Sequence, residues 1–264
     1  MKFIKFFAEG KERWGYLKNG KIVEIALSNV VEKEEIEERG KAFENFKVLP
    51  PFFGSKIVCL GLNYRSHVKE NKTEMPKNPI LFSKAITSLI SSKDPVMKPK
   101  VVERLDYEVE LVFVISKKAK KVGKEECYDY IFGYTIMNDI SARDLQFSDK
   151  QWFRSKSCDT FCPLGPCIAD KAEIKDPMSL DIEMRVNGNI MQKANTEEMI
   201  FDIPYILEFV TETITLLPGD IVATGTPAGV GVFRKPHYFL KDGDVMEANI
   251  EGIGKLENAV IFEK

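Results

Sequence analysis

Two glutamates, two residues apart, are the part of this sequence that points most directly to chemistry. Glu108 and Glu110 lie at the head of a strongly apolar run within residues 106–115, which is typical of a strand. Side chains alternate between the two faces of a strand, so both carboxylates project from the same face. Buried carboxylates need a positive partner, and the run contains no lysine or arginine. A bound cation is therefore the economical explanation.

A third carboxylate, Asp139, ends a second apolar stretch at residues 131–139. Three carboxylates at strand ends suit a hard, oxygen-seeking ion, and we expect Mg²⁺ or Mn²⁺. The alternative is that all three are solvated strand ends, where acidic residues are common. The apolar residues around them favour the metal site.

A histidine and a lysine could carry proton chemistry beside such an ion. His67 is one of only two histidines, and Glu70 follows it by three residues on an expected helix. Residues three apart share a helix face, so Glu70 could orient an imidazole that takes a proton from water. An ordinary surface pair is an equally good reading of the residues alone. Lys156 could stabilise developing negative charge, although an exposed loop is the more usual place for a lysine.

The glycine-rich segment at residues 225–231 follows a short apolar run at residues 221–224. It lacks the Gly-Lys-Ser/Thr ending of a phosphate-binding P-loop. Its backbone N–H groups could cradle a substrate carboxylate, or its glycines could serve only a tight turn.

Composition describes an ordinary soluble protein and excludes several classes. With 264 residues, the chain could form one large domain or a main domain with a small appendage. A net charge of -2 gives no case for nucleic acid, and no apolar run is long enough to span a membrane. The N-terminus does not resemble a signal peptide, and five cysteines, an odd number, favour a reducing, cytoplasmic setting. Cys158, Cys162 and Cys167 lack zinc-site spacing, so packed thiols are expected.

The pair Pro50-Pro51 marks a boundary, and we expect a small β-rich domain at residues 1–52 before a main domain at residues 55–264. In the first domain, the sequence Asn19-Gly20 predicts a hairpin between strands at residues 14–17 and 22–25. A charged helix is expected at residues 31–39.

In the main domain, strands separated by short helices are expected. The patterns predict a strand at residues 57–60, a hairpin at 181–193, an amphipathic helix at 203–211, and closing strands at 245–250 and 256–262. Because strands and helices do not alternate regularly, a mostly antiparallel core is favoured over a doubly wound sheet.

Four segments together resemble the fumarylacetoacetate hydrolase family. They lie at residues 61–67, 106–110, 138–146 and 223–231. A fifth segment, at residues 156–166, is similar to the family's lysine segment, and the match covers about residues 55–264. The resemblance implies a strand-dominated α+β fold, a mixed β-roll with short peripheral helices, together with a Mg²⁺ or Mn²⁺ site and a homodimer.

The resemblance also assigns roles to single residues. It implies metal ligands at Glu108, Glu110 and Asp139, catalytic groups at His67, Glu70 and Lys156, and substrate contacts at Arg143, Gln146, Gly225 and Thr226. The larger hydrolases of the family carry a further aspartate near the position of Asn63. Its absence makes this chain similar to the smaller branch of acylpyruvases and hydroxydienoate isomerases.

The leading functional hypothesis is metal-dependent hydrolysis of a C–C bond in acylpyruvates or other 1,3-diketo acids, through an enolate. The same site could instead decarboxylate oxaloacetate-like acids, isomerise hydroxydienoates or dehydrate 2-keto-3-deoxy sugar acids. Only hydrolysis requires His67 and Glu70 to activate water. The alternative from a different class is a non-catalytic ligand-binding scaffold. The expected partner is a small 2-oxo acid, with no nucleic acid and no membrane.

Overall fold

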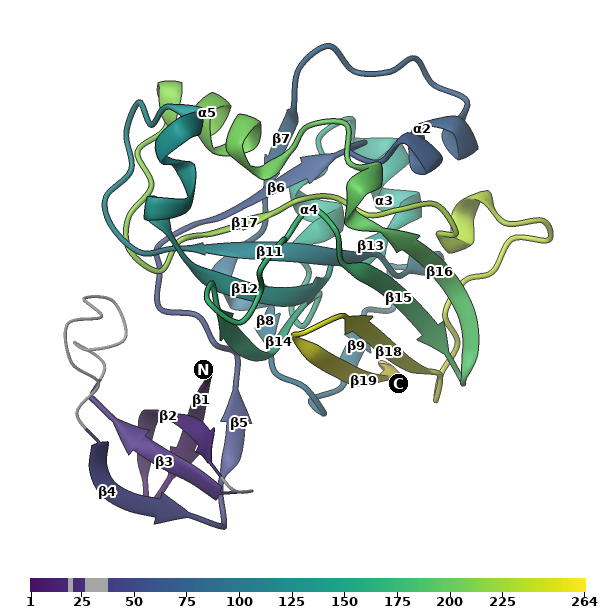
Figure 1. The fold of residues 1–264 in the computed structure, drawn as a ribbon. Coiled ribbons are helices and arrows are strands. Elements are labelled where there is room, and N and C mark those ends of the chain that lie inside the picture. Colours follow the sequence, from purple (N-terminus) through teal and green to yellow (C-terminus); the bar gives the residue numbers. More distant parts are fainter. Residues whose placement is uncertain (19–20, 27–37) are drawn as a thin grey trace.

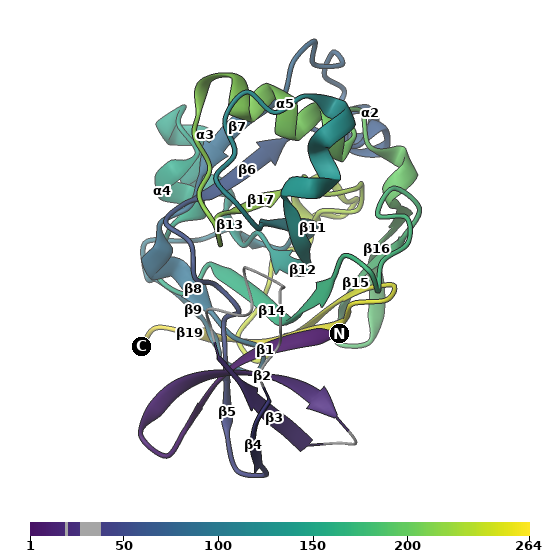
Figure 2. The ribbon, with the colours of Figure 1, turned by 60° about the vertical axis from the view of Figure 1, so that its left-hand side comes forward.

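The computed structural model describes residues 1–18, 21–26 and 38–264. Strands dominate it, as the strand-dominated α+β prediction requires (Figure 1). The first five strands are β1 (Lys2–Ala8), β2 (Lys11–Lys18), β3 (Lys21–Ile25), β4 (Glu38–Phe43) and β5 (Lys47–Leu49). In Figures 1 and 2 they form a unit beside the main body.

The predicted hairpin of this first unit is present, since β2 and β3 pair antiparallel. Its turn, at residues 19–20, lies outside the described residues. Most of the helix predicted at residues 31–39 also lies outside them, but its last two residues, Glu38 and Arg39, belong to strand β4. Pairing of β4 with β3 overrides the helical charge pattern there.

One large sheet runs from the first unit into the main body. Its strand order is β4-β3-β2-β1-β14-β12-β11-β17-β6-β7. The six strands in the main body are β14 (Cys162–Asp170), β12 (Ile131–Asn138), β11 (Val109–Ile115), β17 (Ile221–Ala223), β6 (Ile57–Gly61) and β7 (Ile80–Ser83). Because β1 pairs with β14, the sheet crosses the boundary predicted near residue 52, and the division into two domains stays a prediction.

A second sheet packs in the main body, with strand order β16-β15-β18-β19-β9. Its strands are β16 (Asn189–Asn195), β15 (Asp181–Val186), β18 (Val245–Ile250), β19 (Gly254–Phe262) and β9 (Val96–Lys98). Short strands complete the set: β8 (Leu89–Ile90), which pairs with β14, and β10 (Leu105–Asp106), which pairs with β13 (Ser141–Ala142). Most pairings are antiparallel, which confirms the predicted core. The predicted hairpin at residues 181–193 is formed by β15 and β16.

Helices are short and peripheral. Among the described residues, the α-helices are α2 (Arg65–Asn71), α3 (Arg143–Asp149), α4 (Phe153–Lys156) and α5 (Ile203–Thr213). The 3-10 helices are η1 (Ile86–Ser88), η2 (Lys124–Tyr130), η3 (Thr196–Glu198) and η4 (Gly231–Phe233). Helix α5 matches the predicted amphipathic helix, and the carboxylate of Asp202 caps its start by accepting from the Tyr205 N–H at 2.8 Å. None of the helices within the described ranges is both long and apolar enough to cross a membrane.

The two central strands of the large sheet explain where the chemistry lies. Every residue of β11 and β12 is buried, which is why both read as continuous apolar runs. They pair antiparallel, with Val109 opposite Asn138. The residues just outside this register, Glu108 and Asp139, are therefore brought side by side. Helices α2 and α3 lie on the side of the main body away from the first unit (Figures 1 and 2).

Candidate active site

The structure brings the three predicted metal ligands together. Asp139 donates its backbone N–H to the Glu108 carbonyl at 2.8 Å, and Glu110 points to the same side from the start of β11. One carboxylate oxygen from each of the three residues lies within 4.8 Å of the other two, and all three side chains are buried. The period-two spacing of the glutamates is thus realised as one cluster, which we call the acidic triad.

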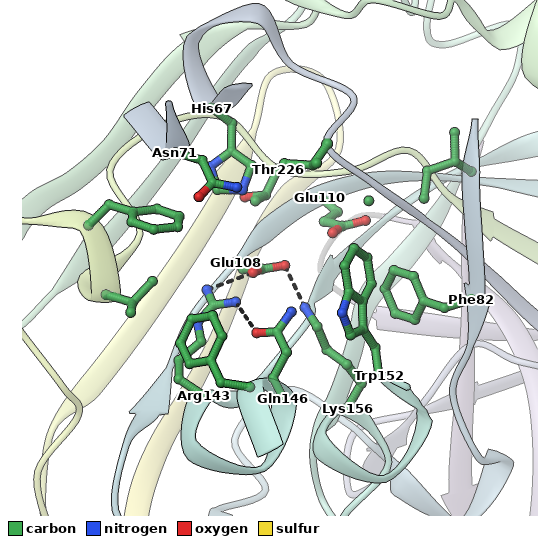
Figure 3. Close-up of a pocket in the computed structure, with 16 residues that line it drawn as sticks. His67, Asn71, Phe82, Glu108, Glu110, Arg143, Gln146, Trp152, Lys156 and Thr226 are labelled. Atoms are coloured by element: carbon green, nitrogen blue, oxygen red, sulfur yellow. Dashed lines mark hydrogen bonds and ion pairs between the residues drawn. The ribbon is translucent and has the colours of Figure 1, made fainter. Parts of the chain in front are cut away.

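Protein cations from other segments pair with the acidic triad, and Figure 3 shows two of them, Arg143 and Lys156, beside Glu108. The Lys156 ammonium lies between Glu108 Oε2, at 2.8 Å, and Asp139 Oδ2, at 2.7 Å. Arg143 pairs with Glu108 at 2.6 Å, and Lys84 pairs with Asp139 at 2.5 Å. The absence of a nearby basic residue in the sequence was therefore an incomplete argument for a bound ion, because the fold supplies positive partners from a distance. Lys156 is buried on α4 and does not lie in an exposed loop.

Glu110 is the member of the acidic triad that still needs a partner. Its Oε2 accepts the Gly225 N–H at 2.9 Å, whereas its Oε1 is buried without a hydrogen-bond partner in the described part of the chain. Burial, together with the charges of Asp139 and Glu108, raises the pKa of Glu110 well above its usual range. A divalent cation at Oε1 would supply the missing partner. The all-oxygen donor set fits Mg²⁺ or Mn²⁺.

Glu108 is the opposite case within the same cluster. Burial alone would raise the pKa of its carboxyl, but the charges of Lys156 and Arg143 hold that pKa at about 2. Glu108 is thus held ionised by the protein itself. Of the three carboxylates, Glu110 is the one whose charge the described side chains compensate least.

The glycine-rich segment at residues 225–231 contacts the acidic triad through a backbone hydrogen bond from Gly225 to Glu110. Gly225 has a φ of +91°, and a Cβ there would lie 3.0 Å from the Cβ of Asn63, so glycine is required. Its N–H orients Glu110. The Thr226 hydroxyl donates to the Val109 carbonyl at 2.9 Å and accepts from Gln192 at 2.8 Å. Thr226 lines the pocket, but its only hydroxyl proton is already engaged, and the substrate contacts predicted for both residues stay predictions.

Two buried residues that sequence reasoning did not assign hold the site together. Asp106 accepts from Arg143 Nε at 2.9 Å and from the backbone N–H groups of Gly231 and Val232 at 2.8 and 3.0 Å. It therefore joins the acidic side of the pocket to helix η4. Lys84, the second, follows β7 and is fully buried against Asp139. Nothing in the sequence separates Lys84 from the chain's other lysines.

His67 lies on α2 and faces the same pocket. Its Nδ1 is 3.4 Å from Glu70 Oε2, and both Glu70 oxygens also accept the Gly229 N–H at 3.1 Å. Figure 3 shows His67 and Asn71 on one side of Glu108 and Lys156 on the other. The helix predicted after residue 64 thus places its histidine as the spacing suggested.

The pocket encloses a cavity of about 140 Å³, which is a size that suits a small organic acid. Its polar lining consists of His67, Asn71, Glu108, Glu110, Arg143, Gln146, Lys156 and Thr226. Its apolar lining consists of Leu60, Leu62, Phe82, Phe147, Trp152, Val232 and Phe233. Gly61 also lines it, and a Cβ on Gly61 would lie 2.3 Å from the Trp152 ring, so this glycine makes room for the indole.

The three clustered cysteines take no part in this site. Cys158, Cys162 and Cys167 are free thiols, two of them buried, as the packed-thiol prediction expects. In the described ranges, the acidic triad is the one grouping of three or more acidic, histidine or cysteine side chains close enough to share an ion.

Comparison with known proteins places this site in a family. The family model described as fumarylacetoacetate (FAA) hydrolase C-terminal matches residues 56–261. An uncharacterised protein of Methanocaldococcus jannaschii is 49% identical over 244 residues, covering 92% of this chain and 95% of that protein. A mitochondrial oxaloacetate tautomerase of Xenopus laevis is 44% identical over 220 residues, covering 82% of this chain and 69% of the relative.

A solved structure shows the same fold as this chain. The crystal structure of 2-hydroxyhepta-2,4-diene-1,7-dioate isomerase from Mycobacterium marinum superposes with a TM-score of 0.88 at 34% identity, covering 100% of this chain and 99% of that one. The strand-dominated fold is the same in the two proteins. Sequence and fold together show that this chain belongs to the fumarylacetoacetate hydrolase family of enzymes.

Proposed function

We propose that this protein hydrolyses a C–C bond in acylpyruvate-type 2-oxo acids, with a divalent metal ion. The observation that carries the proposal is the placement of His67 and Lys156 on opposite sides of Glu108, around one small cavity. An imidazole that takes protons and an ammonium that stabilises negative charge are the two groups that such a hydrolysis needs.

The reaction consumes one water molecule. An acylpyruvate, R–CO–CH₂–CO–COO⁻, gives R–COO⁻, pyruvate and one proton. The bond between C3 and C4 breaks, the water oxygen bonds to C4, and C3 gains a proton as the pyruvate enol becomes the ketone. Glu108, Glu110 and Asp139 would hold the metal ion, which when bound supplies Lewis-acid polarisation of the 2-keto oxygen.

The first task, activation of water, belongs to His67. Its Nδ1 faces Glu70, so Nε2 is left to accept a proton from water in the cavity. The Glu70 carboxylate then stabilises the imidazolium. A hydrogen bond from the Gly229 N–H fixes Glu70 in turn, so the pair is held from outside the helix.

The second task, stabilisation of the enolate, belongs to Lys156. Although burial opposes its charge, the neighbouring Asp139 and Glu108 raise the pKa of this ammonium above its usual value. Lys156 therefore stays cationic and acts by its charge. Its position between two members of the acidic triad keeps it next to the site where the 2-oxo group would lie.

A second candidate is keto–enol tautomerisation of oxaloacetate-like acids. The printed function of the Xenopus laevis relative, at 44% identity, favours it. Tautomerisation needs only proton transfer at C3 and no attack by water. His67 would then move the proton between carbon and solvent.

One assay panel separates the two candidates. Acetylpyruvate and oxaloacetate are each incubated with the enzyme and Mg²⁺, and loss of the ultraviolet-absorbing enol and release of pyruvate are both measured. We expect Mg²⁺-dependent release of pyruvate and acetate from acetylpyruvate, abolished by His67→Gln, whereas oxaloacetate decarboxylation needs no activated water and survives it. Rapid oxaloacetate tautomerisation with no acetylpyruvate cleavage would replace hydrolysis by the second candidate.

A further inference from the structure

The guanidinium that lines the pocket is already engaged by the protein's own polar groups. Arg143 is almost fully buried, and three polar side chains, two of them carboxylates, lie close to its nitrogens. These are Asp106 at 2.9 Å from Nε, Gln146 at 2.9 Å from Nη1, and Glu108 at 2.6 Å from Nη2. Nη2 makes no hydrogen bond within the described chain, but Asp106 and Glu108 already compensate the charge of the guanidinium, so it offers a substrate carboxylate little net attraction.

The other basic side chains of the lining also have partners within the protein. Lys156 bridges Glu108 and Asp139, and the imidazole of His67 is directed by Nδ1 toward Glu70. The remaining polar lining residues that carry no charge are Asn71, Gln146 and Thr226. Among the described residues, the lining therefore offers no unpaired cation to a second carboxylate on the substrate.

Apart from Asn71 and Gln146, the half-buried and exposed side chains of the lining are apolar. Phe147 on α3 lines it although 61% of the residue is exposed, and Val232 and Phe233 on η4 line it from another segment. Trp152 and Phe82 contact each other with ring centroids 5.4 Å apart, and Figure 3 shows them beside Lys156. The part of a substrate that extends outward from the acidic triad thus meets aromatic and aliphatic side chains.

We infer that the site selects 2-oxo acids whose distal acyl group is apolar, and that Phe147 is a specificity-determining residue for that group. This inference rests on the proposed function, because it assumes that the 2-oxo acid end binds at the acidic triad. An apolar acyl group gains by leaving water against Phe147, whereas a distal carboxylate would lose part of its hydration there without gaining an ionic partner. Phe147, the most exposed of these lining residues, lies at the rim of the cavity, where it can contact a chain that leaves it.

Two substrates of equal length test the inference. 2,4-Dioxoheptanoate ends in a propyl group, and 2,4-dioxoheptanedioate ends in a carboxylate at the same distance. We expect wild-type kcat/KM to favour the first by about tenfold or more, within the range that one pocket contact supplies. Phe147→Arg should lower this ratio by about tenfold, because it adds a cation at the mouth. Equal or better use of the dicarboxylate by the wild type would overturn the inference.

The chain offers a matched control for this substitution. Phe153 is 53% exposed on the neighbouring helix α4 but does not line the pocket. Phe153→Arg adds the same charge to the same region, so the ratio should stay at the wild-type value. An equal drop in both variants would show a general electrostatic effect and count against Phe147 as the recognising residue.

A binding measurement keeps this test separate from the proposed reaction. The chain has two tryptophans, so Trp14→Phe leaves Trp152 in the pocket wall as the only one. Quenching of its fluorescence by each acid, with Mg²⁺ present, gives two dissociation constants. Tighter binding of the monocarboxylate without turnover would support the inference and refute hydrolysis. Turnover of both acids with preference for the dicarboxylate would support hydrolysis and refute the inference.

Discussion

The inner and outer sides of the pocket are built in different ways. The inner side is the acidic triad, at the ends of two fully buried strands, where Lys84, Lys156 and Arg143 pair with the carboxylates. The outer side is formed by side chains on short helices: Phe147 is exposed, Val232 and Phe233 are half-buried, and His67 is buried. Under the proposed function, this difference corresponds to a division of labour: the inner side would fix the electrostatics of the reaction, and the outer side would supply the proton carrier and select the substrate.

The largest effect is expected at Glu110. Glu110→Gln removes the carboxylate whose Oε1 lacks a partner, so Mg²⁺ binding measured by calorimetry should be lost. Activity should fall on the order of 10³-fold, since a bound metal contributes several kcal/mol to charge stabilisation. The melting temperature without metal should not fall, because a buried carboxyl with a raised pKa is replaced by a neutral amide.

The control is Glu125→Gln, at an exposed position on η2. This substitution should change neither Mg²⁺ binding nor activity. If Glu110→Gln bound Mg²⁺ as the wild type does, the ion would have to lie outside the acidic triad. The inner side would then be a structural ion-pair cluster only, and the comparison between the two sides would fail.

The carboxylates of the inner side could be predicted from the sequence because their arrangement follows from local strand geometry. Two glutamates at a spacing of two share a strand face, and an aspartate at the end of a paired strand meets them. Their positive partners were not readable: Lys84 pairs with Asp139 across 55 residues of chain, and Lys156 pairs with Glu108 across 48. Only the packing of the whole sheet brings such residues together.

The residues of the outer side could be predicted from the sequence only in part. His67 and Glu70 follow from helix spacing, but Phe147 and Trp152 lie on or beside short helices whose sequence shows no distinguishing pattern. The same limit explains the strand at Glu38–Phe43, where pairing with β3 decides the backbone and local charge does not. Local periodicity predicts long buried elements well, and short exposed ones depend on neighbours that the sequence does not name.

A substitution at Asp106 tests how strongly the inner side of the pocket is linked to helix η4 on the outer side. Asp106→Asn replaces a fully buried carboxylate that binds Arg143 and the start of η4, and it leaves a buried guanidinium short of an anion. We expect the free energy of unfolding to fall by about 3 kcal/mol, as for other buried pairs that lose one partner. Denaturant titration measures this. Asp144→Asn, which removes the charge of a carboxylate that binds two exposed backbone N–H groups, is the control and should cost less.

A small loss of stability in Asp106→Asn would mean that η4 is held without this link. In that case Val232 and Phe233 could move independently of the acidic triad, and the outer side would be less well defined than the structure shows. Measuring the Mg²⁺ affinity of the same variant sharpens the comparison, because an unchanged affinity would place the whole effect on the outer side.

The smallest effect is expected at Glu70. Its contact with His67 is long for a hydrogen bond, at 3.4 Å, and its link to the Gly229 N–H can be kept by an amide oxygen. Glu70→Gln therefore removes only the charge that stabilises the imidazolium. We expect kcat for acylpyruvate hydrolysis to fall by about tenfold, the effect typical of an orienting partner, with KM and Mg²⁺ affinity unchanged.

The exposed Glu74, beyond the end of α2, gives the matched control Glu74→Gln, which should retain wild-type kcat. A fall for Glu70→Gln as large as that for His67→Gln would mean that the two side chains act as a unit, so that the carboxylate is as necessary as the imidazole. A fall in Mg²⁺ affinity would be more serious. It would show that the charge on α2 reaches the acidic triad, and that the inner and outer sides are one electrostatic system.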